Sequence, residues 1–352
     1  MTRTAQPAAS DVDRGFEPAR AEVGTRRAVA INYHFVRSRN GSRFGLRAHE
    51  RPERFEQQLA RLAREFRFCR VRDLVDPERD LPASNIVLTF DDGAKDVVEA
   101  AVPLLERHAA TATVFVCSQP YLDGRLLEIQ KIEFLMRELS LARFRKAFYA
   151  ELERQFPKGA ERESLDFAGG YRFYRYDEDS IRELKLDRNY RLPYANVVPV
   201  LDSLFSAVFG EGSEAVAVRE TYMSVDDLKR LFDGGFELGV HTAHHWVLPR
   251  LDFEAQKREI QTGVEFLRET TGQTQFAVAY PFGFHDDRTR RAMEELDLLA
   301  GLTTGRRMIE PEDIRARWSL PRYDVNDCFD RRSNEIIHEV FAKLSTGSGR
   351  SA

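Results

Sequence analysis

The sequence predicts an α/β fold in which helices surround a parallel sheet with enough strands to close a barrel. Short apolar segments rich in β-branched residues alternate with segments that show helical periodicity. The connections between these segments are short, which is typical of β/α units. Residues 121–222 break the alternation with helical patterns of their own, and we interpret them as a largely helical insertion.

The composition narrows the class of protein. The chain has 352 residues, of which 42% are hydrophobic and 31% charged, and its net charge is −4. These values are typical of a soluble globular protein and give no argument for a nucleic-acid partner or a membrane surface. The sequence contains no run of 18 apolar residues, so it predicts no transmembrane segment. Residues 1–26 contain no apolar signal segment, and we therefore expect a cytoplasmic location.

Domain limits follow from the two ends of the chain. We expect residues 1–26 to be a disordered arm, because they are polar and show no periodicity, and residues 346–352 to be a tail. The barrel domain then spans 27–345. The three cysteines lie far apart and form no CxxC pair, so we expect buried thiols rather than disulfides or a zinc-thiolate site.

The expected strands are short apolar runs. They lie at 28–36, 86–90, 111–116, 236–240, 276–280 and near 299–304. The expected helices lie between them. They span 51–66, 94–109, 224–235, 252–272 and 286–298. The helix near 224 has the clearest limits, because Ser224 and Asp227 fit an N-terminal cap and two glycines follow the last turn.

The barrel without residues 121–222 is shorter than the roughly 250 residues of an eight-unit barrel. The sequence therefore favours a barrel with fewer strands, or an open one. In such a fold the chemistry lies in the loops that follow the strands.

Two adjacent carboxylates, Asp91 and Asp92, follow the predicted strand 86–90 in the segment IVLTFDDG. Neighbouring side chains of a strand point to opposite faces, so the two can serve different functions. Two close carboxylates also resist ionising together unless a cation is near. Taken alone, the segment Asp91-Asp92-Gly93 is more typical of a turn or of the N-terminal cap of the following helix.

Two histidines, His241 and His245, follow the predicted strand 236–240 in the segment GVHTAHH. If the chain turns helically there, both rings lie on one face and can bind one metal ion. Histidines after a strand are also common as surface or hydrogen-bonding residues. We expect His244, which lies between them, to stay outside the ligand set.

The two motifs support each other, because both follow strands that would end at the same rim of a parallel barrel. Two imidazoles and one carboxylate leave open coordination positions and suit zinc or another divalent first-row ion. One aspartate would then bind the ion, and the other would take a proton from the water that the ion activates.

The motifs TFDDG, HTAHH and AYPFG, in this order and each after a strand, resemble those of the polysaccharide deacetylase family. These are the family-four carbohydrate esterases, which share the NodB-homology domain. INYHFV with the helix after it, YMSVDDLKRLFDGGFELGVHT and LPRYDV add to the resemblance, which covers about two-thirds of the chain and omits the insertion. It implies a deformed (β/α) barrel of about seven units.

The resemblance also implies roles for single residues. Asp91 would be the catalytic base, and a divalent metal, with zinc as the first choice, would be bound by three side chains. These are Asp92, His241 and His245. Many members pair the base with an arginine at the position of Ala279, and here Arg322 of LPRYDV can take its place.

The general acid is less clear from the resemblance, because many members use a late histidine. The late candidate here is His338, which lies in a helical pattern. His34, at the end of the first predicted strand, is our candidate for the acid or for a substrate contact, and His285 is another.

The implied function is that of a metal-dependent hydrolase that removes an acetyl or formyl group from an amino sugar. The partner would be an N-acylated amino sugar in a glycan, or in a lipid-linked or nucleotide-linked intermediate. The stretch around Tyr171, Phe173, Tyr174 and Tyr176 could cap the site and contact sugar or phosphate, or could only pack the insertion. Two alternatives remain open: an inactive glycan-binding module on the same scaffold, and an amidase acting on a non-sugar amide.

Overall fold

The computed structural model describes residues 25–37, 44, 50–157, 182–183, 187 and 191–345. The predicted arm 1–26, except for its last two residues, the tail 346–352 and the aromatic stretch at 171–176 lie outside the described residues. Among the described helices, none combines the length and the apolar character needed to cross a membrane.

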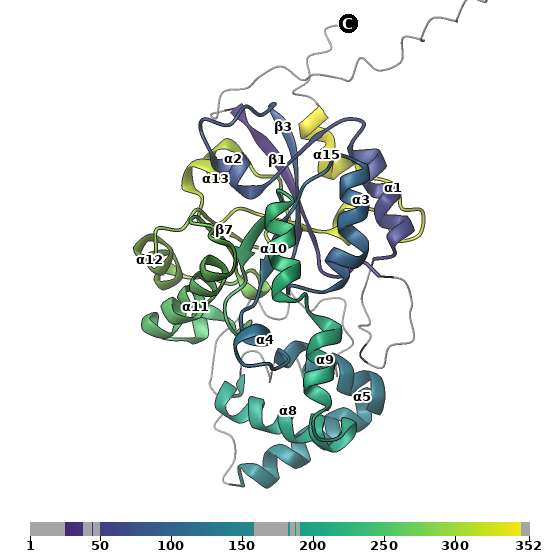
Figure 1. Ribbon diagram of the computed structural model, residues 1–352, viewed down its shortest axis with the longest axis vertical. Coiled ribbons are helices and arrows are strands. Elements are labelled where there is room, and N and C mark those ends of the chain that lie inside the picture. The colour runs from purple at the N-terminus through teal and green to yellow at the C-terminus, as the bar shows by residue number, and fades with distance from the viewer. Residues whose placement is uncertain are drawn as a thin grey trace, which may run out of the picture.

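One curled parallel sheet of eight strands forms the centre of the molecule (Figure 1). Its order is β7-β6-β5-β4-β3-β1-β8, and β2 pairs with β3 beside this path. The strands are β1 (Arg27–Tyr33), β2 (Arg67–Cys69), β3 (Ser84–Phe90), β4 (Thr113–Val116), β5 (Glu237–Val240), β6 (Ala277–Ala279), β7 (Ala300–Leu302) and β8 (Tyr323–Asp324). The sequence analysis missed β2 and β8, because their residues, RFC and YD, form no apolar run.

The two ends of this sheet come together. Leu302 of β7 forms a parallel bridge with Leu320, where the N–H of Leu320 donates to the carbonyl of Gly301 at 2.8 Å. Leu320 leads into β8, and β8 pairs with β1 through Tyr323 and Ile31. The predicted fold class, a deformed (β/α) barrel, is therefore confirmed.

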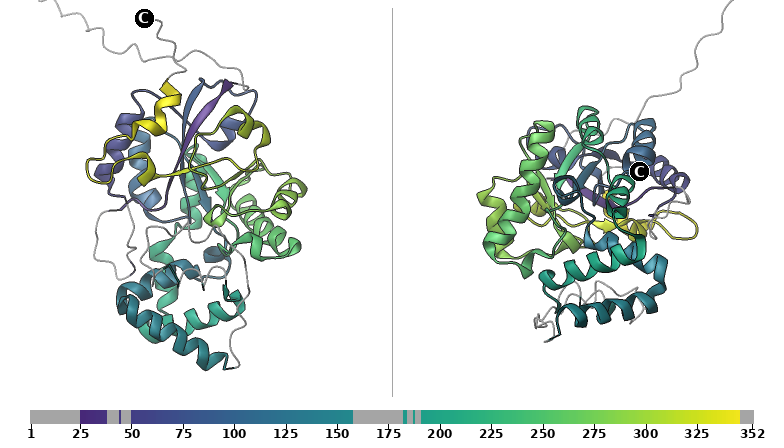
Figure 2. Two further views of the ribbon diagram at one scale, coloured as in Figure 1. Left: turned by 180° about the vertical axis from the view of Figure 1, so that it is seen from behind. Right: turned by 60° about the horizontal axis from the view of Figure 1, so that its bottom comes forward.

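Helices cover the outside of the sheet (Figures 1 and 2). They are α1 (Pro52–Leu62), α2 (Val71–Val75), α3 (Val102–Arg107), α10 (Val225–Asp233), α11 (Phe253–Thr271), α12 (Asp287–Glu295), α13 (Pro311–Ala316), α14 (Val325–Cys328) and α15 (His338–Ser345). The predicted cap of α10 is present, because Ser224 Oγ accepts from the N–H of Asp227 at 3.1 Å and the Asp227 carboxylate accepts from the N–H of Ser224.

The helix expected over 94–109 is not a regular α-helix. It begins as a π-helical turn over Val97–Ala101 and continues as α3. Pro103 explains the change, because its nitrogen has no hydrogen to donate and its ring clashes with the carbonyl four residues earlier in a regular helix.

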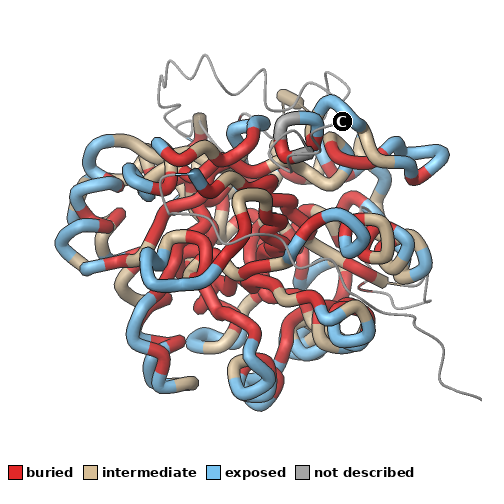
Figure 3. Tube along the Cα trace, turned by 90° about the horizontal axis from the view of Figure 1, so that it is seen from above, coloured by how far each residue is buried: buried red, intermediate tan, exposed pale blue. Residues whose placement is uncertain are grey.

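The core lies between the sheet and these helices, and buried residues gather along the centre of the trace in Figure 3. Strands β1 and β3 are buried almost throughout, as expected for parallel strands covered on both faces. The three cysteines are buried and unpaired, as predicted.

The described residues of 121–222, which we call the helical segment, are mainly helical. They contain α5 (Glu128–Gln155), which is interrupted at Ser140, α8 (Tyr194–Phe209) and α9 (Ser213–Thr221), and the short α4 (Gln119–Leu122) precedes α5. The segment has a hydrophobic cluster of its own. It lies at one end of the barrel in Figure 1. Its last residues hydrogen-bond to the chain just after β3, where the N–H of Lys95 donates to the carbonyl of Thr221 at 2.8 Å.

Candidate active site

Strands β1 and β3 place the first part of the site. Tyr33 pairs with Phe90 at the ends of these strands, and the N–H of Asp91 donates to the carbonyl of Tyr33 at 3.0 Å. His34 and Asp91 therefore leave the sheet at the same level, on the rim formed by the carboxyl ends of the strands. This is the rim where a parallel barrel carries its chemistry.

Asp91 forms a buried ion pair with Arg322. Nη1 of Arg322 donates to Oδ1 of Asp91 at 2.8 Å, and Nη2 donates to Oδ2 at 3.0 Å. Asn32 donates to the same Oδ2 at 2.9 Å. Burial alone would raise the pKa of the Asp91 carboxyl, but the positive charge and hydrogen bonds of Arg322, together with His241, outweigh burial and hold this pKa well below its usual range.

Arg322 is fixed on all sides, which explains how a fully buried guanidinium is tolerated. Besides Asp91, its Nη1 donates to Thr89 Oγ1 and Asn32 Oδ1, each at 3.1 Å, and its Nε donates to the carbonyl of Thr303 at 3.2 Å. The arginine thus reaches Asp91 from the segment just before β8. Arg322 therefore lies beside the predicted base Asp91, as the sequence analysis proposed for a residue that replaces the arginine missing at Ala279.

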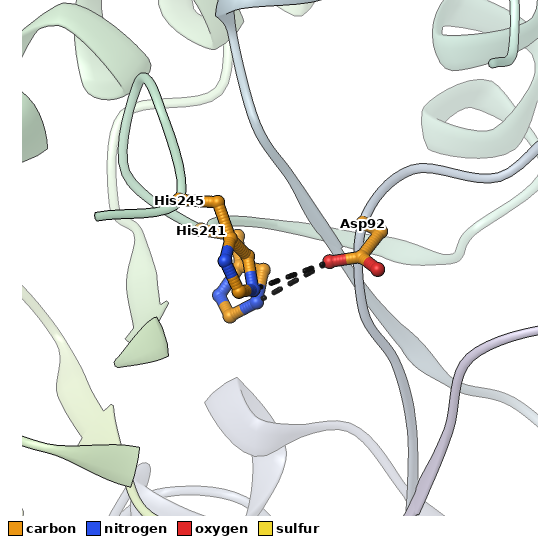
Figure 4. Close-up of side chains that lie close together, drawn as sticks. All are labelled: Asp92, His241 and His245. Atoms are coloured by element: carbon orange, nitrogen blue, oxygen red, sulfur yellow. Dashed lines mark ion pairs between the residues drawn. The ribbon is translucent and has the colours of Figure 1, made fainter. Parts of the chain in front are cut away.

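Asp92, His241 and His245 converge from the turns after β3 and β5 (Figure 4). Oδ1 of Asp92 lies 3.6 Å from Nε2 of His241 and 3.6 Å from Nε2 of His245. One ligand atom of each residue lies within 4.8 Å of the other two, and all three residues are buried. The structure therefore brings together the three side chains predicted to bind a metal.

The two histidines meet without the helical turn that their spacing would also allow. The chain does not turn helically after β5, because Thr242 and His245 have positive φ values of 63° and 61°. The N–H of His245 instead donates to Thr242 Oγ1 at 3.0 Å, and this tight loop sets the two rings at 80° with centroids 4.7 Å apart. Asp92 also has a positive φ, 70°. Such strained backbone is typical of functional positions.

The donor set fits a divalent cation. Oδ1 of Asp92 is buried and has no hydrogen-bond partner among the described residues. Burial raises the pKa of the Asp92 carboxyl, and the neighbouring Asp91 adds to this effect, so the ionised form lacks a sufficient counter-charge. Nδ1 of His241 lies 2.7 Å from the carbonyl of Ala279, which accepts its hydrogen and leaves the Nε2 lone pair turned toward Asp92.

The other histidines lie in different places. His34 follows Tyr33 at the end of β1, on the same rim as Asp91. His285 stacks on Tyr280 with centroids 4.9 Å apart, and burial lowers its pKa. His338 is exposed at the start of α15, whose last turn accepts a hydrogen bond from Ser84 at the opposite end of β3.

His244 stays outside the ligand set, as the sequence predicted. Its Nδ1 lies 2.6 Å from Oε1 of Glu259, and its ring stacks on Trp246. Sequence reasoning missed Asn32 and Gln130, which contact Asp91 and Asp92, and Phe282, which packs edge-on against His245 at 4.8 Å. A polar residue within the apolar run of β1 was a signal for Asn32, whereas nothing in the sequence distinguishes Gln130.

A sequence model of the polysaccharide deacetylase family matches residues 78–135 and 206–301. The matched ranges contain Asp91, Asp92, His241 and His245, and they omit much of the helical segment. The match confirms the resemblance seen in the motifs. A comparison with curated proteins found no match.

Several solved structures share the fold at low identity. The deacetylase PplD of Streptococcus pyogenes, solved in complex with acetate, is 17% identical with a TM-score of 0.52, and the match covers 85% of this chain and 92% of PplD. The polysaccharide deacetylase BC0361 of Bacillus cereus is 16% identical with a TM-score of 0.50, covering 91% and 69%. IcaB of Ammonifex degensii is 14% identical with a TM-score of 0.50, covering 92% and 98%.

Proposed function

Because this chain carries a polysaccharide deacetylase domain, we propose that it is a metal-dependent hydrolase that removes an acetyl or formyl group from the nitrogen of an amino sugar. One observation carries the proposal: three buried ligand atoms converge directly beside an aspartate that is paired with a buried arginine. Acetate, which is bound in the PplD structure, is the product that N-deacetylation would release.

The two aspartates have different surroundings, and we therefore assign them different roles. Asp92 Oδ1 and the Nε2 atoms of His241 and His245 would hold the ion, with zinc as the first choice and other first-row divalent ions as alternatives. When bound, such an ion acts as a Lewis acid on the amide carbonyl and lowers the pKa of water to about 7.

Asp91 would accept the proton of the attacking water. Its carboxylate is ionised at neutral pH, because Arg322 holds its pKa low, and it therefore has a lone pair available. Oδ2 of Asp91 lies 3.9 Å from Nε2 of His241, so the base borders the position of the ion. Arg322 and Asn32 fix the carboxylate in this place, which general base catalysis requires.

His34 is our candidate for the general acid that donates a proton to the departing amine. The attack adds water to the amide carbon, and the carbon–nitrogen bond then breaks with the proton passing to nitrogen. His34 stands at the end of β1 beside Asp91 and can deliver this proton from the rim. The products are a free amino sugar and a short carboxylic acid.

Release of acetate and formate from N-acyl amino sugars tests the proposal. The substrates are free, polymeric and nucleotide-linked forms, and each is offered to the protein with Zn²⁺ and with a chelator. We expect release only with metal, and Asp91→Asn should lower kcat by about 10²- to 10⁴-fold, the usual contribution of a general base. Asp287→Asn, at an exposed position of α12, is the matched control and should leave kcat unchanged.

Two results would contradict the proposal. If metal-loaded wild type and Asp91→Asn are equally inert on every N-acyl sugar, but bind glycans, the inactive binding module is favoured. If only non-sugar amides are cleaved, the protein is an amidase of another class.

The cytoplasmic location stays a prediction, and fractionation of cells that express the protein checks it.

A further inference from the structure

The two oxygens of Asp92 have different surroundings. Oδ1 faces His241 and His245, as described above. Oδ2 instead accepts a hydrogen bond of 3.3 Å from Nε2 of Gln130. Gln130 is 2% exposed and lies in the first turn of α5, so this donor comes from the helical segment and not from the barrel.

The amide of Gln130 is held in one orientation. Its Oε1 accepts a hydrogen bond of 3.1 Å from the hydroxyl of Tyr222, and that hydroxyl accepts one of 3.1 Å from the N–H of Leu127. A side-chain amide has a carbonyl at one end and two N–H donors at the other. Because Tyr222 occupies the carbonyl, the N–H donors face Asp92.

We propose that Gln130 is a positioning residue of the metal site, and that the helical segment thereby completes a site whose ligands all come from the barrel. This inference rests on the proposed metal-dependent function. A donor on Oδ2 restrains rotation of the Asp92 carboxylate and leaves Oδ1 turned toward the two imidazoles. Partners of this kind orient metal ligands, and their loss typically costs about 10- to 100-fold in metal affinity.

A second contact ties the helical segment to the histidine loop. Trp246 follows His245, and its ring stacks on Tyr194 of α8 with centroids 4.6 Å apart and planes at 7°. The hydroxyl of Tyr194 accepts a hydrogen bond of 2.8 Å from the N–H of Val247. The helical segment therefore contacts both turns that carry the predicted ligands, the one after β3 and the one after β5.

A purely structural role for Gln130 predicts a different result. In that case the hydrogen bond to Asp92 only offsets the free-energy cost of burying the Gln130 amide. Its loss would lower the stability of the fold without changing how the folded protein binds metal. The affinity of the folded protein for the metal alone distinguishes the two roles.

The variant Gln130→Met keeps the approximate length of the side chain and removes its N–H donors. In the full chain, freed of metal by a chelator, we expect calorimetric titration to show Zn²⁺ binding about 10- to 100-fold weaker than in wild type. Gln155→Met is the matched control at the far end of α5, where Gln155 bonds to Glu151, and should bind Zn²⁺ like wild type. The visible absorption of bound Co²⁺ should change in Gln130→Met and not in the control, because it reports the ligand geometry.

Tyr222→Phe gives an independent variant, because it removes the hydroxyl that holds the amide and leaves Gln130 in place. We expect a smaller loss of Zn²⁺ affinity than in Gln130→Met. If both variants fold and bind Zn²⁺ as tightly as wild type, the inference about Gln130 is overturned and the proposed function stands. If Gln130→Met does not fold, wild-type Zn²⁺ affinity in Tyr222→Phe has the same consequence. A wild-type protein that binds no divalent ion would overturn both.

Discussion

The barrel rim and the helical segment both reach the candidate metal site, but they differ in how their residues are placed. On the rim, Asp91, Asp92 and the two histidines follow directly from strand ends that pair in register. In the helical segment, Gln130 and Tyr194 approach from helices with a hydrophobic cluster of their own. The difference shows that a motif can identify ligands while the residues that orient them lie elsewhere in the chain.

This difference also explains what the sequence could predict. Each apolar run of the sheet is buried on both faces, so the strands and the order of the motifs along one rim follow from pattern alone. Arg322 was proposed beside Asp91 because LPRYDV resembles an element of the family and the arginine expected at Ala279 is missing, and the structure supplies the contact itself. The spacing of the histidines suggested one way for them to meet, a helical turn, but the loop has positive φ values at Thr242 and His245 instead. Such values depend on tertiary contacts that no local pattern records.

The helical segment was predicted only as a class of structure. Helical periodicity indicates α5 and α8, but the break of α5 at Ser140 leaves no sign in the pattern. The contact of Gln130 with Asp92 joins residues 38 positions apart in the sequence. Nothing local to either residue selects this pairing, and only the packing of the segment on the barrel creates it.

The largest effect that we expect on stability lies on the barrel side. Arg322→Met leaves Asp91 as a buried charge without its cation, which should lower the free energy of unfolding by about 3–5 kcal/mol. Urea unfolding measures this change. The double variant with Asp91→Asn should recover much of the loss, because it also removes the unpaired charge.

Arg288→Met is the matched control for this prediction. Arg288 pairs with Asp286 at 2.7 Å but is 47% exposed, so its loss should cost no more than about 1 kcal/mol. If Arg322→Met proves as stable as Arg288→Met, the buried pair does not hold the rim together in the way that we describe.

A smaller effect should appear on the side of the helical segment. Tyr194→Ala removes the ring that stacks on Trp246, and the loss of stacking alone should cost about 0.5–1.5 kcal/mol. Tyr194→Phe keeps the ring and removes only the hydroxyl that contacts Val247. The chain has two tryptophans, so in a Trp318→Phe background the fluorescence reports Trp246 alone.

We expect the emission of Trp246 to shift to longer wavelength in Tyr194→Ala, because water reaches the uncovered face of the ring, and to stay unchanged in Tyr194→Phe. The same emission in both variants would show that Tyr194 does not cover Trp246, and the histidine loop would then depend on the barrel alone.

Titration of Zn²⁺ into the chelator-treated protein tests most directly whether Asp92, His241 and His245 form one metal site. We predict a single Zn²⁺ bound per chain in wild type, loss of this binding in His241→Ala, and wild-type binding in His108→Ala, which changes a histidine far from the site that lies beside Glu56. Unchanged binding in His241→Ala, or no binding in wild type, would contradict the account.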